Sequence, residues 1–357
     1  MNDKFYKNKT ILITGHTGFK GSWLSEILVN WGCDVIGYSL NPPTNPNLFN
    51  LLNLESKLTS ITGDIRDLNN LNMVFKQYSP DIVIHMAAQP LVRESYENPV
   101  YTFETNVMGT VNICECVRQS DSVKSFLNVT TDKVYENVEK HEGYREDEKL
   151  DGYDPYSNSK SCSELVTHSY INSFFKELDI PVSTARAGNV IGGGDFASDR
   201  IIPDCFRASL ENKDIIIRNP HSIRPYQHVL EPLYMYLTMT KIQFENHNKA
   251  GYYNIGPDDK DCVETSKLVN LYCRYFNENN TSKIRWIDKS DNGPHEANFL
   301  KLDNTKIKKT FNWSATWNIE TAIEKTVEWI NVYLNDGDII NCVDSQINEF
   351  FKQKCGD

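Results

Sequence analysis

Residues 10–24 read Thr10-Ile11-Leu12-Ile13-Thr14-Gly15-His16-Thr17-Gly18-Phe19-Lys20-Gly21-Ser22-Trp23-Leu24. The apolar run within residues 10–14 predicts a buried strand, and the stretch from Ser22 to Trp31 predicts a helix. The three glycines between them allow the backbone to turn tightly and to approach a pyrophosphate at the N-terminus of that helix. A tight turn without a ligand is the alternative. The placement of the loop between strand and helix favours dinucleotide binding.

The first half of the chain repeats this alternation of short apolar runs and amphipathic stretches. Residues 34–38, 81–85, 125–129 and 182–186 predict further strands, and residues 106–118 predict a long helix. Strands that alternate with helices are typical of a parallel, doubly wound sheet. The expected fold class is therefore α/β, with a Rossmann-type sheet.

The sequence changes in character after Asn189. Gly192-Gly193-Gly194 interrupts the alternation, and the C-terminal third contains amphipathic helices such as residues 319–334. These changes predict a second, smaller α/β domain for the substrate. We expect the dinucleotide-binding domain to cover residues 1–188 and about 228–250, and the substrate domain to cover residues 189–227 and 251–357.

Composition excludes several classes of function. The chain has 357 residues and a formal net charge of -11, which disfavours nucleic-acid binding. Residues 1–10 do not resemble a signal peptide, and no apolar run approaches the roughly 18 residues of a membrane helix. The nine cysteines are scattered, without the spacing of a metal site. We therefore expect no metal, no membrane contact, and reduced thiols in a cytoplasmic protein.

Two polar segments carry the candidate chemistry. Tyr156 and Lys160 are four residues apart, so they share one face of a helix, where the cation can lower the pKa of the phenol. Thr131, Asp132 and Lys133 provide a hydroxyl, a carboxylate and an amine in consecutive positions. This is more acid–base equipment than a simple dehydrogenase needs. It predicts a redox enzyme that also performs an elimination.

The sequence leaves the choice between NAD and NADP open. The second predicted strand ends in Tyr38-Ser39-Leu40-Asn41, which offers neither a carboxylate for a ribose hydroxyl nor an arginine for a 2′-phosphate. Asp64, after the third strand, is a candidate acceptor for the adenine amine, or the residue of an ordinary strand-end turn.

Four motifs together resemble the extended short-chain dehydrogenase/reductase family. They stand in the order of that family: Thr14-Gly15-x-x-Gly18-x-x-Gly21, His85-Met86-Ala87-Ala88, Asn106-Val107-Met108-Gly109-Thr110 and Tyr156-x-x-x-Lys160. The resemblance covers nearly the whole chain. It implies a Rossmann-type domain, an NAD cofactor held throughout turnover, and a nucleotide sugar bound by the C-terminal domain.

The segment Thr131-Asp132-Lys133 indicates a subgroup of this family. The family's 4,6-dehydratases carry Thr-Asp-Glu at this place, and the lysine resembles the CDP-glucose 4,6-dehydratases. Further stretches are similar to the same subgroup: residues 15–23, 224–232 and 295–303. The resemblance therefore implies CDP-glucose as the substrate. We assign His295 and Glu296 to domain packing.

The resemblance implies a role for each catalytic residue. Tyr156 removes the proton of the sugar's C4 hydroxyl, which Thr131 orients, and Lys160 assists the tyrosine and binds the nicotinamide ribose. Asp132 and Lys133 share the elimination of water across C5 and C6, and which is acid and which is base stays open.

The resemblance also implies two sets of binding residues. For the cofactor they are Gly15, Thr17, Gly18, Phe19, Lys20, Asp64, Ile65, Ala87, Ala88, Gln89, Asn106, Tyr156 and Lys160. For the substrate they are Arg93, Asn189, Arg200, Arg224, Tyr226 and Asn254. The arginines and asparagines are candidates for the diphosphate and Tyr226 for stacking on the base, although Arg93, Arg200 and Tyr226 equally suit structural roles.

Three alternatives remain at this point. The chain could be a 4,6-dehydratase for another nucleotide sugar, a 4-epimerase, or a non-catalytic binding protein on the same fold. The intact Thr131, Tyr156 and Lys160 disfavour the last. The family also implies a homodimer built as a four-helix bundle, with helices near residues 106–118 and 156–175 as candidates.

Overall fold

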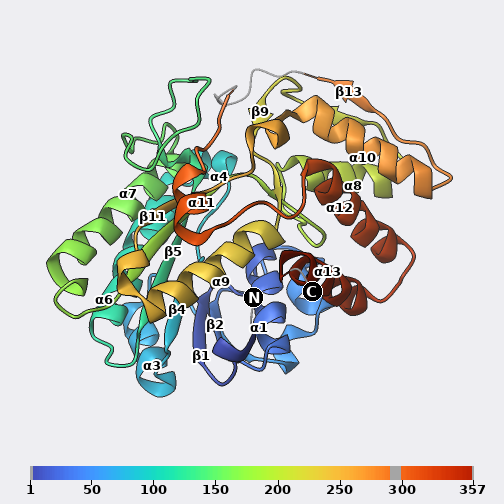
Figure 1. The fold of residues 1–357 in the computed structure, drawn as a ribbon. Coiled ribbons are helices and arrows are strands. Elements are labelled where there is room, and N and C mark those ends of the chain that lie inside the picture. Colours follow the sequence, from blue (N-terminus) through green and yellow to red (C-terminus); the bar gives the residue numbers. More distant parts are fainter. Residues whose placement is uncertain (1–2, 290–298, 356–357) are drawn as a thin grey trace.

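The computed structural model describes residues 3–289 and 299–355. Within these residues, seven strands form one parallel sheet in the order β11-β6-β5-β4-β1-β2-β3 (Figure 1). The strands are β1 (Thr10–Thr14), β2 (Asp34–Ser39), β3 (Thr59–Thr62), β4 (Ile82–His85), β5 (Ser125–Thr131), β6 (Val182–Ala187) and β11 (Tyr252–Ile255). The predicted Rossmann-type α/β fold is confirmed.

Helices cover both faces of the sheet because successive side chains of a strand point to opposite faces. Ile11 and Ile13 belong to the apolar core formed with helices α1 and α9, whereas Leu12 between them belongs to the core formed with α3 and α6. α7 packs beside α6. These helices are α1 (Phe19–Asn30), α3 (Leu68–Tyr78), α6 (Gly109–Arg118), α7 (Pro155–Tyr170) and α9 (Leu230–Glu245).

The C-terminal part adds a second group of elements. They are α8 (Ile201–Leu210), β8 (Ile215–Ile217), β9 (Ile223–Arg224), β12 (Val263–Glu264), α10 (Thr265–Asn279), β13 (Trp286–Asp288), α12 (Ile319–Leu334) and α13 (Ile339–Cys355). β8 pairs with β13, β9 pairs with β12, and α10 packs on α12. In Figure 1, α8, α10 and α12 gather at one end of the molecule. His295 and Glu296 lie outside the described residues.

Strand β11 corrects one predicted domain limit. The sequence analysis ended the nucleotide-binding part at about residue 250, but Tyr252–Ile255 pairs with Thr184–Ala187 of β6 as the outermost strand of the main sheet. The final helix α13 also returns to this part, where Phe351 packs edge-on against Trp31 at the end of α1. The rest of the domain division stays a prediction.

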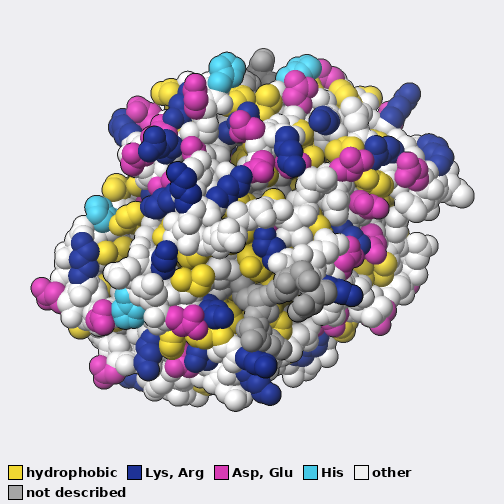
Figure 2. All heavy atoms as spheres, in the orientation of Figure 1, with side chains coloured by type: hydrophobic (Ala, Val, Ile, Leu, Met, Phe, Trp, Pro, Cys, Tyr) yellow, Lys and Arg dark blue, Asp and Glu magenta, His cyan; other side chains and the backbone are white. Residues whose placement is uncertain are grey.

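The surface carries charges of both signs. On the face that Figure 2 shows, acidic and basic side chains are interspersed. Among the described residues, no helix is long and apolar enough to cross a membrane. In the same part of the chain, no three His, Cys, Asp or Glu side chains are grouped so that they could hold a metal ion.

The side chain of Glu231, in the first turn of α9, is a buried carboxyl. Its altered pKa makes the free energy of unfolding depend on pH. Its Oε1 accepts backbone N–H bonds from Thr316 and Trp317, both at 2.7 Å, and burial raises its pKa to about 7. An unfolded glutamate titrates near 4.3. Folding therefore takes up a proton between these values, and the stabilisation present below the unfolded pKa is lost as pH rises through 7.

We expect Glu231→Gln to remove this part of the pH dependence, because the amide keeps an acceptor oxygen and carries no charge. The contribution is on the order of 3 kcal/mol between about pH 4 and pH 8. Thermal midpoints of both proteins across this range measure it. Parallel curves for the wild-type protein and the variant would show that Glu231 does not titrate in this range.

Candidate active site

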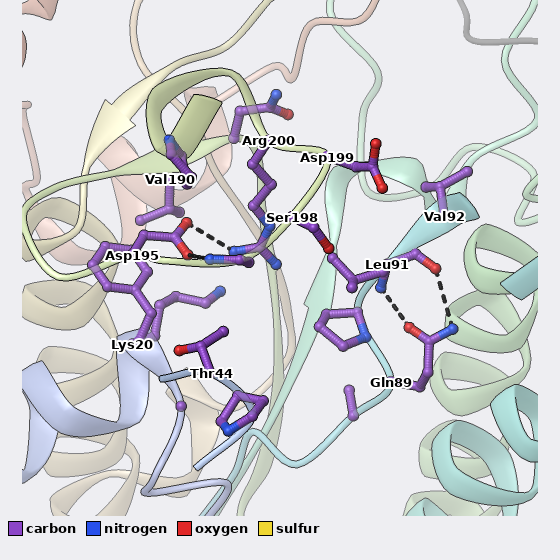
Figure 3. Close-up of a pocket in the computed structure, with 18 of the residues that line it drawn as sticks. Lys20, Thr44, Gln89, Leu91, Val92, Val190, Asp195, Ser198, Asp199 and Arg200 are labelled. Atoms are coloured by element: carbon purple, nitrogen blue, oxygen red, sulfur yellow. Dashed lines mark hydrogen bonds and ion pairs between the residues drawn. The ribbon is translucent and has the colours of Figure 1, made fainter. Parts of the chain in front are cut away.

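A cavity of about 1140 Å³ lies between the carboxyl ends of the sheet strands and the C-terminal elements (Figure 3). Its walls come from the loops after β1, β2, β3, β4, β5 and β6, together with α8, β9 and the end of β8. In parallel α/β sheets, ligands bind at the carboxyl ends of the strands. The cavity is therefore the candidate active site.

The glycine loop forms one wall as the sequence predicts. Gly15 has a φ of +79°, and a Cβ on Gly21 would lie 2.1 Å from the carbonyl oxygen of Gly15. Helix α1 has Gly18 as its N-cap and no side chain that caps its first amides. Those amides remain available for a phosphate. The cavity wall includes Gly15, Thr17, Gly18, Phe19 and Lys20.

The far end of the cavity suits an adenosine. Asp64 and Ile65 line it, and the Asp64 carboxylate holds the Arg66 side chain, whose hydrogen bonds lower the pKa of Asp64. The hydroxyl of Thr17 bonds Ser39 Oγ and donates to the Leu40 carbonyl oxygen, both at 2.9 Å. These contacts fit a dinucleotide whose pyrophosphate meets the start of α1.

The catalytic candidates converge at the end of β5. The Thr131 hydroxyl donates to Asp132 Oδ1 over 3.0 Å, and its proximity to Tyr156 acts to lower the pKa of the phenol, against the larger effect of burial. Asp132 Oδ2 is buried and has no hydrogen-bond partner within residues 3–289 and 299–355. Burial raises the pKa of the Asp132 carboxyl. The structure thus brings Thr131, Asp132, Lys133 and Tyr156 together in the wall of one cavity.

Helix α7 positions Tyr156 and Lys160. Asp154 caps the helix by accepting the Ser157 N–H at 2.9 Å, and Pro155 occupies its first turn. Lys160 is buried and its ammonium donates to the Val129 carbonyl oxygen at 3.2 Å.

The structure does not show the predicted effect of Lys160 on the pKa of Tyr156, because Lys160 contacts the Val129 carbonyl. Burial raises the pKa of Tyr156 to about 12, and it lowers the pKa of Lys160 to about 8. The ammonium is directed at a backbone carbonyl rather than at the phenol, which with a pKa of about 12 is protonated near neutral pH. Lowering its pKa requires that the lysine turn towards it.

A buried ion pair behind the site was missed by sequence reasoning. Glu164, one turn after Lys160, pairs with Arg186 of β6 at 2.9 Å and accepts a bond from Thr130, next to the candidate residue Thr131. Arg186 also donates to the Tyr135 hydroxyl at 2.8 Å. The helical spacing of Glu164 from Tyr156 and Lys160 was a signal that could have found it.

Five of the six predicted substrate residues lie in the cavity wall, and the sixth, Asn254, does not. Arg93, Asn189, Arg200, Arg224 and Tyr226 line the cavity. Arg200 is held by Asp195 at 3.0 Å, and the two meet above Lys20 in Figure 3. Tyr226 is buried, with its hydroxyl 3.1 Å from Thr265 Oγ1.

Asn254 is a correction to the predicted substrate set. It is fully buried in β11, accepts the Tyr135 hydroxyl at 2.6 Å and donates to the Tyr144 carbonyl oxygen at 2.7 Å, so its amide is occupied outside the cavity wall.

The predicted cofactor residues also differ in depth. Ala87, Ala88 and Gln89 line the cavity. Asn106 lies behind them and accepts the Gln89 N–H at 2.9 Å, so it supports the loop.

Burial, together with the charge of Arg200, lowers the pKa of Lys20 to about 8.

Comparisons with known proteins agree with this geometry. The family model described as GDP-mannose 4,6 dehydratase matches residues 12–326. The CDP-glucose 4,6-dehydratase of Salmonella typhimurium is 43% identical over 98% of each chain. Two solved structures share the fold. The dTDP-glucose 4,6-dehydratase of Bacillus anthracis in complex with NAD has a TM-score of 0.74 at 21% identity over 93% of this chain and 99% of that one.

The second is the UDP-glucuronic acid 4-epimerase of Bacillus cereus with UDP-glucuronic acid and NAD, with a TM-score of 0.77 at 22% identity over 91% and 99% of the two chains. The resemblance to the extended short-chain dehydrogenases/reductases is confirmed, and the chain belongs to the GDP-mannose 4,6 dehydratase family within them.

Proposed function

We propose that the protein converts CDP-D-glucose to CDP-4-keto-6-deoxy-D-glucose by C4 oxidation, loss of water across C5 and C6, and reduction at C6. The main support for this function is that Thr131, Asp132, Lys133 and Tyr156 lie together in the wall of one cavity. The start of α1 forms another part of the same wall. Similarity over the full length to a CDP-glucose 4,6-dehydratase supports the choice of nucleotide.

The cavity fits an NAD cofactor. The first amides of α1 suit its pyrophosphate, while Thr17, Asp64 and Ile65 line the end that suits the adenosine. NAD, when bound, supplies the hydride acceptor for C4 and the donor that later reduces C6. Because the hydride returns to the sugar, the overall reaction is the loss of one water molecule.

Tyr156 and Thr131 act in the oxidation. Thr131 orients the C4 hydroxyl and Tyr156 accepts its proton. Because burial holds the pKa of Tyr156 at about 12, we propose that Lys160 leaves the Val129 carbonyl in the loaded enzyme and turns its ammonium towards the phenol. An opposite charge within reach favours the phenolate.

Asp132 and Lys133 act in the elimination. The 4-ketone acidifies the C5 hydrogen, and Lys133 takes that proton. Asp132, whose pKa is raised by burial, holds a proton that it gives to the departing C6 hydroxyl, which leaves as water. The resulting 4-keto-5,6-ene regains a hydride at C6 and a proton at C5.

A panel of CDP-, dTDP-, GDP- and UDP-hexoses tests the substrate. We expect a 4-keto-6-deoxy product, detected by its alkali-induced absorbance and by a mass loss of one water, from CDP-glucose in preference to the others. A sugar product of unchanged mass would point to a 4-epimerase. Preferential turnover of another nucleotide sugar to its 4-keto-6-deoxy product would support the 4,6-dehydratase reaction but show that the nucleobase of the substrate is not cytosine.

Arg224 is the proposed anchor of the diphosphate. It lines the cavity at the end of β9 and is largely buried. A charge-assisted hydrogen bond is worth about 1.5–3 kcal/mol. Arg224→Ala is therefore expected to raise the dissociation constant of CDP roughly tenfold to hundredfold.

Calorimetric titration with CDP measures this effect. Arg224→Lys is expected to recover only part of the affinity, because an ammonium lacks the two-pronged contact of a guanidinium. Unchanged CDP affinity in Arg224→Ala would give the residue a structural role and move the assignment to Arg200.

We also propose a homodimer that packs as a four-helix bundle. Large apolar side chains are exposed along the helical segments at residues 99–118 and 155–175: Val100 (70%), Phe103 (36%), Met108 (50%), Leu165 (53%) and Phe174 (40%). Exposed apolar side chains that gather into one patch mark interaction sites, and we propose that these residues form such a patch. Leu165→Glu is expected to give a monomer in sedimentation experiments, with Leu178→Glu, on the turn that follows, as the control. A monomeric wild-type protein would contradict the proposal.

We place the reaction in the cytoplasm, in the synthesis of deoxysugars for polysaccharides such as O-antigen. Free thiols support this location: the eight cysteines whose side chains are described are all unpaired.

A further inference from the structure

The rim of the cavity contains an ion-pair cluster that joins the two parts of the molecule. Asp199 Oδ1 lies 3.0 Å from Arg218 Nη1 and 3.6 Å from Arg93 Nε. Arg93 belongs to α4 (Val92–Glu97), which follows sheet strand β4, whereas Arg218 follows β8 in the C-terminal group. All three residues line the cavity, and Figure 3 shows Asp199 on the loop beside Ser198 and Arg200.

We propose that Asp199 is an internal counter-ion that holds Arg93 and Arg218 while the site is free of substrate, and that both arginines transfer to the diphosphate when the nucleotide sugar binds. The inference rests on the proposed function, because it requires a nucleoside diphosphate as ligand. It assigns Arg218 to the substrate site and gives Asp199 a positioning role.

The neighbouring pair shows what a permanent contact looks like in the same loop. Asp195 is buried, accepts the Ala197 N–H at 3.1 Å and holds Arg200 at 3.0 Å. Removing Asp195 would leave the loop amide unpaired. Asp199, by contrast, has a side chain that is 38% exposed, against 5% for Asp195, whereas the arginines of both contacts are similarly exposed, at 34–36%. Ion pairs with this access to water are weak, so a stronger ligand can break them.

The chemistry of the two anions favours exchange. Carboxylate and phosphate oxygens both accept bidentate hydrogen bonds from a guanidinium, and the diphosphate brings more charge and more acceptors. A carboxylate that stayed beside a bound diphosphate would repel it. The diphosphate must therefore displace Asp199. A nucleoside without phosphate has nothing with which to do so.

The variant Asp199→Asn tests the effect of the negative charge of Asp199 separately from the shape of its side chain. Asp199 has a φ of +56°, a left-handed conformation that asparagine also adopts readily, so the substitution keeps the loop and removes one anion, while the longer 3.7 Å contact of Arg218 with Asp204 remains. We expect CDP to bind about 3- to 30-fold more tightly to this variant at low salt. The difference should shrink as the salt concentration rises, and cytidine should bind both proteins equally.

The chain offers a matched control at the other end of β8. Asp214 precedes this strand and pairs with Arg285 at 3.1 Å, away from the cavity wall. Asp214→Asn changes the net charge by the same amount, and we expect it to leave CDP binding unchanged. Arg218→Gln should weaken CDP binding about tenfold. Arg285→Gln should not.

Calorimetric titrations of these variants decide the proposal. Unchanged or weaker CDP binding in Asp199→Asn, or unchanged binding in Arg218→Gln, would overturn it. Equal tightening in Asp214→Asn would also overturn it, since the effect would then follow net charge. Titration with UDP, dTDP and GDP keeps the two proposals apart. If another nucleoside diphosphate binds best and Asp199→Asn still increases its affinity, the proposed cytosine specificity is wrong. In that case the counter-ion role of Asp199 stands.

Discussion

Tyr156→Phe is expected to lower the rate of product formation by a factor on the order of 10²–10⁴, the range that loss of a positioned general base costs. The half-buried Tyr156 lines the cavity together with Thr131, and phenylalanine keeps its ring. Affinities for NAD and CDP should therefore stay within about twofold of the wild-type values. Turnover near the wild-type rate would exclude Tyr156 as the base.

The pH profile gives this variant a second readout. Tyr156 must lose its proton before it can act as the base, so kcat/KM of the wild-type enzyme should rise with pH until the phenol is ionised. Tyr156→Phe should lose that rise. Tyr275→Phe serves as the control, because its hydroxyl meets Glu320 on the surface of the C-terminal group. It should leave both the rate and the profile unchanged.

Asp132→Asn and Lys133→Met are expected to stop the reaction after oxidation, each with a loss on the order of 10²–10⁴ in the rate of water elimination. The stalled enzyme should contain reduced nicotinamide, visible by its absorbance, and a 4-keto-hexose that retains its C6 hydroxyl, visible by mass. Equal slowing of oxidation and elimination in both variants would show that the two residues do not divide the work in this way.

Deuterium separates the two residues. In heavy water, Asp132→Asn should still exchange the C5 hydrogen of the bound ketone, because Lys133 remains. Lys133→Met should not exchange it. The opposite pattern would reverse the assignment of acid and base. Asp151→Asn and Lys149→Met are the controls, since these two side chains pair with each other on the surface at 2.9 Å.

The sequence predicted the elements whose signal is local. The glycine loop at residues 15–21 and the apolar alternation gave the sheet, and helix α12 has the predicted limits, Ile319–Leu334. What depended on distant partners could not be read from the chain. β11 is short, and only its pairing with β6 assigns it to the main sheet.

In the candidate active site too, local motifs could be predicted from the sequence, whereas contacts between distant segments could not. The motif places Tyr156 and Lys160 on one helix face, but the direction of the lysine depends on the Val129 carbonyl, which lies 31 residues away in sequence. Asn254 matched a binding position by order along the chain, yet Tyr135 and Tyr144 occupy its amide. Asp199 gave no sequence signal, because its partners come from two other segments.

The late arrival of β11 bears on how the protein is made. Until residues 252–255 leave the ribosome, β6 is an open edge whose neighbour β5 carries Thr131 at its tip. An unprotected edge strand invites pairing with other chains. A fragment that ends near residue 188 should therefore aggregate, and the longer non-local closure predicts slow maturation during synthesis. Splitting this chain into two fragments should succeed only at points that keep β6 and β11 on the same piece.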